Sequence, residues 1–357
     1  MQFLKFKSLL PAAALAVLCS CSTFDEEKIT LDGERISVLD GETALQPDYA
    51  PGQVKIVLPA PYTNTAWSQN GGNAAHMMGH LSSGSKLKEL WESGFGEGSS
   101  KRDFLIAAPV SAHKAVFTID ADGIVNAFRL DDGRKIWKRR LKPLIKDDIS
   151  TSLKGAGLAV FDKKVYATTG FGAVFALDMV TGKKLWRYDT ELPIRIAPTA
   201  ERGVVFIQTI DNKLIALNGV DGSVLWDYKS PSEETTLVGG ASPAYSPQQD
   251  TIVAAFSNGE LRAFKASTGS PLWSDILVSR KRTNSPANIN AIKANPVIDG
   301  STVYAVGNNN ILVAIDLRSG ARIWEREIGS INQPWVAGKF MFVLSLSLIH
   351  ISEPTRP

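Results

Sequence analysis

Short runs in which apolar and polar residues alternate recur along the middle of the chain. Between residues 155 and 189, the runs GLAVF, KVYATT, GAVFALD and KKLWRY follow one another closely. Alternation with a period of two predicts half-buried β-strands. The polar stretch MVTG before the last run predicts a tight turn, because glycine adopts positive φ without steric cost. This region is therefore expected to form a four-stranded antiparallel meander.

An eleven-residue motif with Ala at its start, Gly six residues later and Trp at its end occurs five times, and its tryptophans lie 40 to 51 residues apart. The Ala, Gly and Trp of the five copies are Ala127, Gly133 and Trp137; Ala176, Gly182 and Trp186; Ala216, Gly222 and Trp226; Ala263, Gly269 and Trp273; and Ala314, Gly320 and Trp324. This period predicts an all-β propeller with four-stranded blades. We expect alanine where blades approach closely, glycine in the turn, and tryptophan docked on a neighbouring blade. An aromatic platform for a ligand is the alternative interpretation of the tryptophans.

The motif resembles the tryptophan-docking motif A-x-D-x-x-x-G-x-x-x-W of quinoprotein-like propellers. Two copies keep its acid, as Asp178 and Asp316, and the other three carry Arg129, Asn218 and Lys265. Together with the phrases AIDLRSGARIWEREIGS and WSQNGGNAAH, the motif resembles the alphaproteobacterial form of the BamB family, lipoproteins of the outer-membrane β-barrel assembly machine. The resemblance implies eight blades, of which we assign five complete blades and part of a sixth to residues 63–344.

The N-terminus has the pattern of an export signal over residues 1–20. Lys5 and Lys7 precede an apolar run that is too short for a permanent membrane span, which needs about 20 residues. The sequence Leu18-Cys19-Ser20-Cys21 resembles a bacterial lipobox, which implies acylation (palmitate) at Cys21 and stable attachment to the periplasmic face of the outer membrane. The alternative is an ordinary secretory signal, cut near Ala14 or Ser20, that releases a soluble protein.

The two ends of the remaining chain depart from the repeat. Residues 21–62 are acidic and contain several prolines, so we expect a solvated tether. Residues 345–357 lack the turn and docking residues, and we expect a non-native tail on a propeller truncated at its C-terminus. The alternative is a six-bladed ring closed by the strand around Trp91, whose sequence KLKELWES resembles the last strand of a blade.

Composition and spacing favour neither nucleic-acid binding nor catalysis. The net charge is only +3, so we expect no nucleic-acid partner. Only two cysteines occur, both near the N-terminus, so the adjacent-cysteine platform of quinone-dependent dehydrogenases is missing from this sequence. His76 and His80 have zinc-like spacing, but no glutamate follows His76 as metalloproteases require. We expect no metal, no cofactor and no catalytic residue.

The resemblance implies a scaffold that binds the POTRA domains of the insertase BamA together with other subunits of the assembly machine. On the stretch ELPIRIAPT it implies partner contacts by Leu192, Ile194 and Arg195. The alternative is that Ile194 and Ile196 simply begin a blade strand. A second, acidic contact element of the family is replaced by Ala291 and Lys293, so no residue is assigned to it.

The sequence allows one further class of partner and two alternative functions. Unfolded outer-membrane proteins are a further partner class, since a free sheet edge pairs with extended chains. A quinone (PQQ)-dependent dehydrogenase and a periplasmic interaction propeller with some other partner are the alternative functions.

Overall fold

A computed structural model describes residues 50, 53, 55–84, 86–101, 104–144, 155–232, 239–277 and 290–346. All of them belong to the unit Tyr49–Pro357, one of two into which the chain divides. The predicted export signal, Cys21, most of the predicted tether and the predicted tail from residue 347 onward lie outside the described residues. The domain boundaries derived from the sequence therefore stay predictions.

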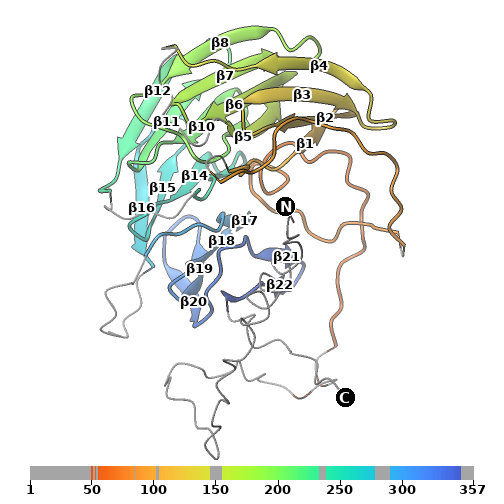
Figure 1. Cartoon of the computed structure of the whole chain (residues 1–357). Coiled ribbons are helices and arrows are strands. Elements are labelled where there is room, and N and C mark those ends of the chain that lie inside the picture. Colours follow the sequence, from red (N-terminus) through yellow and green to blue (C-terminus); the bar gives the residue numbers. More distant parts are fainter. Residues whose placement is uncertain are drawn as a thin grey trace, which may run out of the picture. The chain divides into compact units, whose positions relative to one another are not determined.

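The described residues form five four-stranded antiparallel sheets and one two-stranded sheet, each a simple meander (Figure 1). Blade 1 contains β1 (Val110–Ala112), β2 (Ala115–Ile119), β3 (Ile124–Arg129) and β4 (Lys135–Arg140). Blade 2 contains β5 (Gly155–Phe161), β6 (Lys164–Thr169), β7 (Ala173–Asp178) and β8 (Lys184–Asp189). Blade 3 contains β9 (Thr199–Glu201), β10 (Val204–Gln208), β11 (Lys213–Asn218) and β12 (Val224–Lys229).

Blade 4 contains β13 (Ala244–Ser246), β14 (Thr251–Ala255), β15 (Glu260–Lys265) and β16 (Pro271–Ile276). Blade 5 contains β17 (Val297–Asp299), β18 (Thr302–Val306), β19 (Leu312–Asp316) and β20 (Arg322–Arg326). Strands β21 (Trp335–Ala337) and β22 (Phe340–Phe342) form the two-stranded sheet. The all-β propeller prediction, with five complete blades and part of a sixth, is confirmed for this part of the chain; the total of eight blades stays a prediction.

The hydrophobic core is divided among the gaps between neighbouring blades. Four buried clusters draw their side chains from blades 1 and 2, blades 2 and 3, blades 3 and 4, and blades 4 and 5 respectively. A single blade cannot bury both of its faces, so each blade depends on the next for its apolar contacts.

The repeated tryptophan joins each blade to the following one. Trp186 at the end of blade 2 lies over Gly222 of blade 3, where an added Cβ would stand 2.7 Å from Cε3 of the indole ring. The indole Nε1 donates a hydrogen bond of 3.2 Å to the carbonyl of Gly219 in the same turn. Trp137, Trp226 and Trp273 make the equivalent pair of contacts with blades 2, 4 and 5.

The other motif residues shape the turn that receives the tryptophan. Each motif alanine pairs across the sheet with the tryptophan of its own copy, and a register shift follows immediately. Asp178 Oδ1 accepts hydrogen bonds from the Thr181 amide and hydroxyl, both at 2.7 Å, and these bonds hold the pKa of Asp178 below its usual value. Asp316 caps its turn in the same way through Ser319.

Trp91 docks on blade 1 in the same manner, although it lies outside any strand. Its Nε1 donates to the Leu130 carbonyl at 2.9 Å, and its ring lies over Gly133. The similarity between KLKELWES and the last strand of a blade therefore corresponds to a real docking contact.

Residues Trp67–His80, which we name the crossing segment, contact every blade in turn. The backbone of Trp67 pairs with Ser111 in blade 1, and that of Gln69 pairs with Ala159 in blade 2. Further along, the segment bonds to Ala200, Tyr245, Ile298 and Pro296. Figure 1 shows the orange part of the chain, which includes this segment, close to β1 and β5. The segment therefore joins blades 1 to 5 across long sequence separations.

Candidate interaction site

One face of the propeller collects the links between blades and the turns between second and third strands. Arg195, Gly240 and Lys293 occupy equivalent places in three of these links, each six residues before the last residue of β9, β13 and β17 respectively. Because the blades repeat one geometry, residues with the same phase come together on this face.

Two adjoining cavities, of about 50 and 260 Å³, open between these links. Both are lined by Arg195, Ile196, Gly239, Gly240 and Lys293, so we treat them as one depression and name it the basic hollow. The smaller cavity reaches Gln208 and Asn212, and the larger one reaches Asn70 of the crossing segment.

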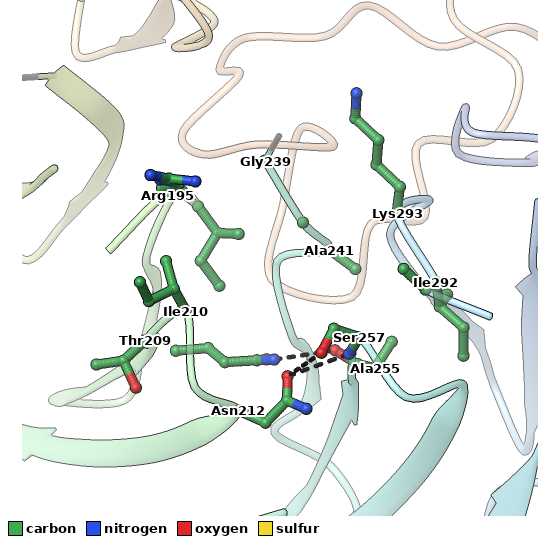
Figure 2. A pocket seen from close by; sticks show the side chains of 14 residues that line it. Arg195, Thr209, Ile210, Asn212, Gly239, Ala241, Ala255, Ser257, Ile292 and Lys293 are labelled. Atoms are coloured by element: carbon green, nitrogen blue, oxygen red, sulfur yellow. Dashed lines mark hydrogen bonds between the residues drawn. The ribbon is translucent and has the colours of Figure 1, made fainter. Parts of the chain in front are cut away.

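The hollow is positively charged. Arg195 and Lys293 are both half-buried, and Figure 2 shows their side chains on opposite sides of the pocket. None of the described residues that line it is Asp or Glu, and no described residue forms an ion pair with either cation. Two cations without an acidic partner among the described residues produce a local potential that attracts anionic groups.

The bottom of the hollow is a fixed hydrogen-bond network, drawn in Figure 2. Asn212 has a positive φ of 65°, and its Oδ1 accepts from the Ser257 amide at 3.1 Å and from the Ser257 hydroxyl at 3.0 Å. Gln208 donates from Nε2 to the Ala255 carbonyl at 3.2 Å. The Gln208 Oε1 is buried and has no hydrogen-bond partner in the described structure.

The three partner-contact residues expected from the sequence have different environments. Leu192 is 38% exposed, Arg195 lines the basic hollow, and Ile194 is completely buried. The Ile194 side chain packs into the core between blades 2 and 3, because the link crosses that gap and turns its apolar side chain inward. Ile194 therefore presents no side-chain surface to a partner, and we correct its assignment to core packing.

The alternative, that Ile194 and Ile196 begin a strand, does not describe the link either. Strand β9 begins at Thr199, and Ile194 makes only an isolated bridge to Thr209. The link is thus an irregular segment held at both ends, which fixes the backbone on either side of Arg195.

Leu192 borders a separate cavity of about 130 Å³ whose lining includes Asp189, Glu191 and Asp211. Asp189 pairs with Arg187, and Asp211 pairs with Lys229 at 2.9 Å. Burial raises the pKa of Asp211, but hydrogen bonds from Thr209 and Lys229 outweigh this, so that pKa lies below its usual value. Asp189 and Asp211 are thus already neutralised by cations of the chain itself. The cations of the basic hollow, in contrast, have no acidic partner among the described residues.

The site does not have the chemistry of a metal or quinone centre. Within the described part of the chain, no three His, Cys, Asp or Glu side chains are grouped so as to hold a metal ion. The Ca²⁺ of quinone-dependent dehydrogenases requires carboxylate oxygens, and the described lining of the basic hollow offers cations instead. The hollow therefore does not fit such a group. The structure also describes no helix of the length and apolarity needed to cross a membrane.

Sequence reasoning named Lys293 only as a departure from the family pattern and did not identify Gln208 or Asn70. The available signal was the blade phase: counting back from the end of each first strand places Lys293 with Arg195. No local pattern marks Asn70, because it reaches the site through the crossing segment from more than a hundred residues away.

Several relatives of the chain are named outer membrane protein assembly factor BamB. The chain is 28% identical over 247 residues to the outer membrane protein assembly factor BamB of Yersinia pestis, covering 68% of this chain and 62% of the relative. It is 31% identical over 258 residues to BamB of Vibrio cholerae, covering 72% and 65% respectively. The chain thus spans less than two thirds of the length of these relatives.

Solved structures agree on the fold. The crystal structure of BamB from Moraxella catarrhalis matches with a TM-score of 0.56 and 18% identity, over 67% of this chain and 69% of that one. A quinohemoprotein alcohol dehydrogenase from Comamonas testosteroni matches with a TM-score of 0.55 and 16% identity, over 74% and 49%. At this identity the two likenesses show the propeller fold alone.

The family model described as outer membrane protein assembly factor BamB matches residues 121–355, which include blades 2 to 5 in full and the last two strands of blade 1, β3 and β4. On this match, the chain belongs to the BamB family of outer membrane protein assembly factors.

Proposed function

We propose that this protein is a non-enzymatic scaffold of the outer-membrane β-barrel assembly machine, and that it binds the POTRA domains of the insertase BamA. Family membership supports the assembly role. The observation that carries the binding role is the Arg195 guanidinium, held in a fixed link beside exposed Leu192 and not neutralised by any described acid.

The proposed contact combines charge with apolar area. Arg195 supplies planar donors suited to a carboxylate or carbonyl on the partner, and Leu192 supplies a surface that is buried on binding. Ile194 fixes the loop from inside the core and is not part of the contact surface.

We also propose that the protein is held at the periplasmic face of the outer membrane by acyl chains on Cys21. The support is the lipobox-like sequence before Cys21 and the outer-membrane role in the names of the relatives. No observation on the described residues favours the dehydrogenase alternative, since the hollow bears cations where that enzyme class needs carboxylates.

The test is co-purification of the insertase from detergent-solubilised envelopes with the wild-type protein and with Arg195→Glu. We expect the insertase to co-purify with wild type and to be largely lost from the variant. Arg202→Glu is the matched control, because Arg202 is exposed in the turn between β9 and β10, at the other end of blade 3. Loss of the insertase from both variants, or its absence from the wild-type sample, would contradict the proposal.

A further inference from the structure

We propose that the basic hollow receives an acidic peptide segment of the assembly partner, with a carboxylate held between the Arg195 guanidinium and the Lys293 ammonium. The proposal rests on the proposed function and adds to it the charge of the partner segment and a second contact residue.

The charge of the basic hollow favours an acidic partner. The two cations lie on opposite sides of one hollow, as Figure 2 shows, and neither is neutralised by a described residue. Acids elsewhere on the molecule, such as exposed Asp131 and half-buried Asp275, pair with arginines of the chain itself. Among the described residues the cations of the hollow thus have no acidic partner, whereas the arginines beside Asp131 and Asp275 do, and a carboxylate would complement the hollow.

The volume of the hollow fits a peptide segment better than a small ion. The larger of the two cavities, about 260 Å³, has room for several water molecules and hence for a side chain with part of its backbone. The smaller cavity continues inward toward Gln208. An extended segment can occupy both cavities, whereas a small ion would leave most of the larger cavity unfilled.

The side-chain oxygen of Gln208 is a buried acceptor that lacks a donor among the described residues. Gln208 is 8% exposed, and its Oε1 lacks a hydrogen-bond donor. A buried acceptor without a partner costs free energy, and a peptide N–H in the hollow would remove that cost once the Gln208 side chain turns its Oε1 toward the cavity. A peptide offers both a carboxylate for the cations and an N–H donor for Gln208, which a simple anion does not.

The residues on either side of Lys293 are held in place by burial and hydrogen bonds. The preceding residue, Ile292, is buried and donates its amide to the Phe256 carbonyl at 3.3 Å. Asn295 Oδ1 accepts from the Ser242 amide at 2.8 Å, and Asn295 Nδ2 donates to Gln333 Oε1 at 3.1 Å. The backbone on both sides of Lys293 is therefore fixed, so within this chain binding orders mainly one side chain, which lowers the entropy cost of the contact.

The first experiment titrates the soluble periplasmic domains of the insertase into the full chain by calorimetry, at low and at physiological salt. Lys293→Glu is expected to weaken binding by about tenfold or more, because it places a like charge beside the partner carboxylate. Lys293→Met removes the charge alone and should weaken binding less. Lys184→Glu, an exposed lysine at the start of β8, makes the same charge change away from the hollow and should leave affinity within about twofold of wild type.

The outcomes separate the two proposals. If Lys293→Glu binds like wild type while Arg195→Glu does not, the proposed function stands and the acidic-segment inference falls. If wild type does not bind the insertase domains at all, both fall. Urea denaturation of each variant shows whether a loss of binding reflects a loss of folding.

The second experiment uses a short capped peptide of alternating glutamate and glycine, the same peptide with glutamine in place of glutamate, and inorganic phosphate as probes. We expect the glutamate peptide to bind wild type and not Lys293→Glu, with affinity falling as salt rises. The glutamine peptide should not bind, and phosphate should not displace the glutamate peptide. Binding of phosphate with the same dependence on Lys293, without binding of the peptide, would show a small-anion site and overturn the inference.

Discussion

A motif glycine such as Gly222 satisfies two requirements at once. Its φ of 78° lies in the left-handed region, and its missing side chain makes room for the indole of Trp186. Gly203 has the same φ of 78°, but an added Cβ there would meet no atom within 4 Å. The two positions therefore separate backbone strain from collision with the docked tryptophan.

Gly222→Ala should lower the free energy of unfolding by about 2 to 4 kcal/mol, since left-handed strain and overpacking each contribute about 1 to 2 kcal/mol or more. Gly203→Ala should cost only the strain, about 1 kcal/mol. Urea denaturation of the two variants gives the comparison. Equal losses would show that the tryptophan contact contributes nothing at this turn.

At this scale the sequence predicted some residues well and others poorly. The placement of Trp186 followed from its repeat, because every copy has the same contacts in a repeating array. The inward orientation of Ile194 could not be predicted, because an irregular link has no periodicity that assigns an apolar side chain to the core or to a partner. That Arg195 and Lys293 line the same hollow can be predicted only when their equivalent positions before the first strands of their blades are known.

At the scale of elements, the blades and the crossing segment differ in how far the sequence reveals them. The strands of a blade pair with their neighbours in the chain, so local alternation and turn residues predicted β5 to β8. The crossing segment makes its hydrogen bonds with partners up to 257 residues away. No local pattern encodes such contacts.

His76 in the crossing segment gives this element a pH dependence. Its Nδ1 donates to the Pro296 carbonyl at 2.7 Å, its Nε2 has no partner among the described residues, and burial lowers its pKa from 6.5 to about 4. The folded state thus keeps His76 neutral at pH values where the unfolded chain takes up a proton. The resulting stability is present above pH 6.5 and is lost as the pH falls toward about 4.

The size of the pKa shift corresponds to about 3 kcal/mol of stability lost at about pH 4. His76→Asn is the matched variant, since an asparagine amide can still donate to Pro296 and asparagine tolerates the φ of 58° at this position. We expect the difference in unfolding free energy between wild type and variant to shift by this amount between pH 7 and 4 in urea titrations. A pH-independent difference would show that His76 titrates alike in both states.

At the scale of the whole molecule, the tryptophan contacts and the crossing segment are two separate ways of joining blades. Each tryptophan couples only a blade and its successor, as in a linear array. The crossing segment instead couples blade 1 to blade 5, and its Asn70 donates to Ser242 at 3.1 Å close to the basic hollow. The cations of the hollow come from different blades, so their spacing depends on both kinds of joint.

Acylation of Cys21 would hold the chain at the membrane that carries its proposed partner. An anchored chain meets a membrane-embedded partner at a high effective concentration, so a modest affinity suffices in the envelope.

Cys21→Ser should therefore abolish labelling with palmitate and release the protein from the membrane fraction, while its affinity for the soluble insertase domains stays unchanged. Cys19→Ser is the matched control and should remain labelled and anchored, since bulky Leu18 precedes Cys19 whereas small Ser20 precedes Cys21. Label retained by Cys21→Ser, or lost from Cys19→Ser, would contradict the assignment. A fall in solution affinity with Cys21→Ser would instead place part of the binding surface near the N-terminus.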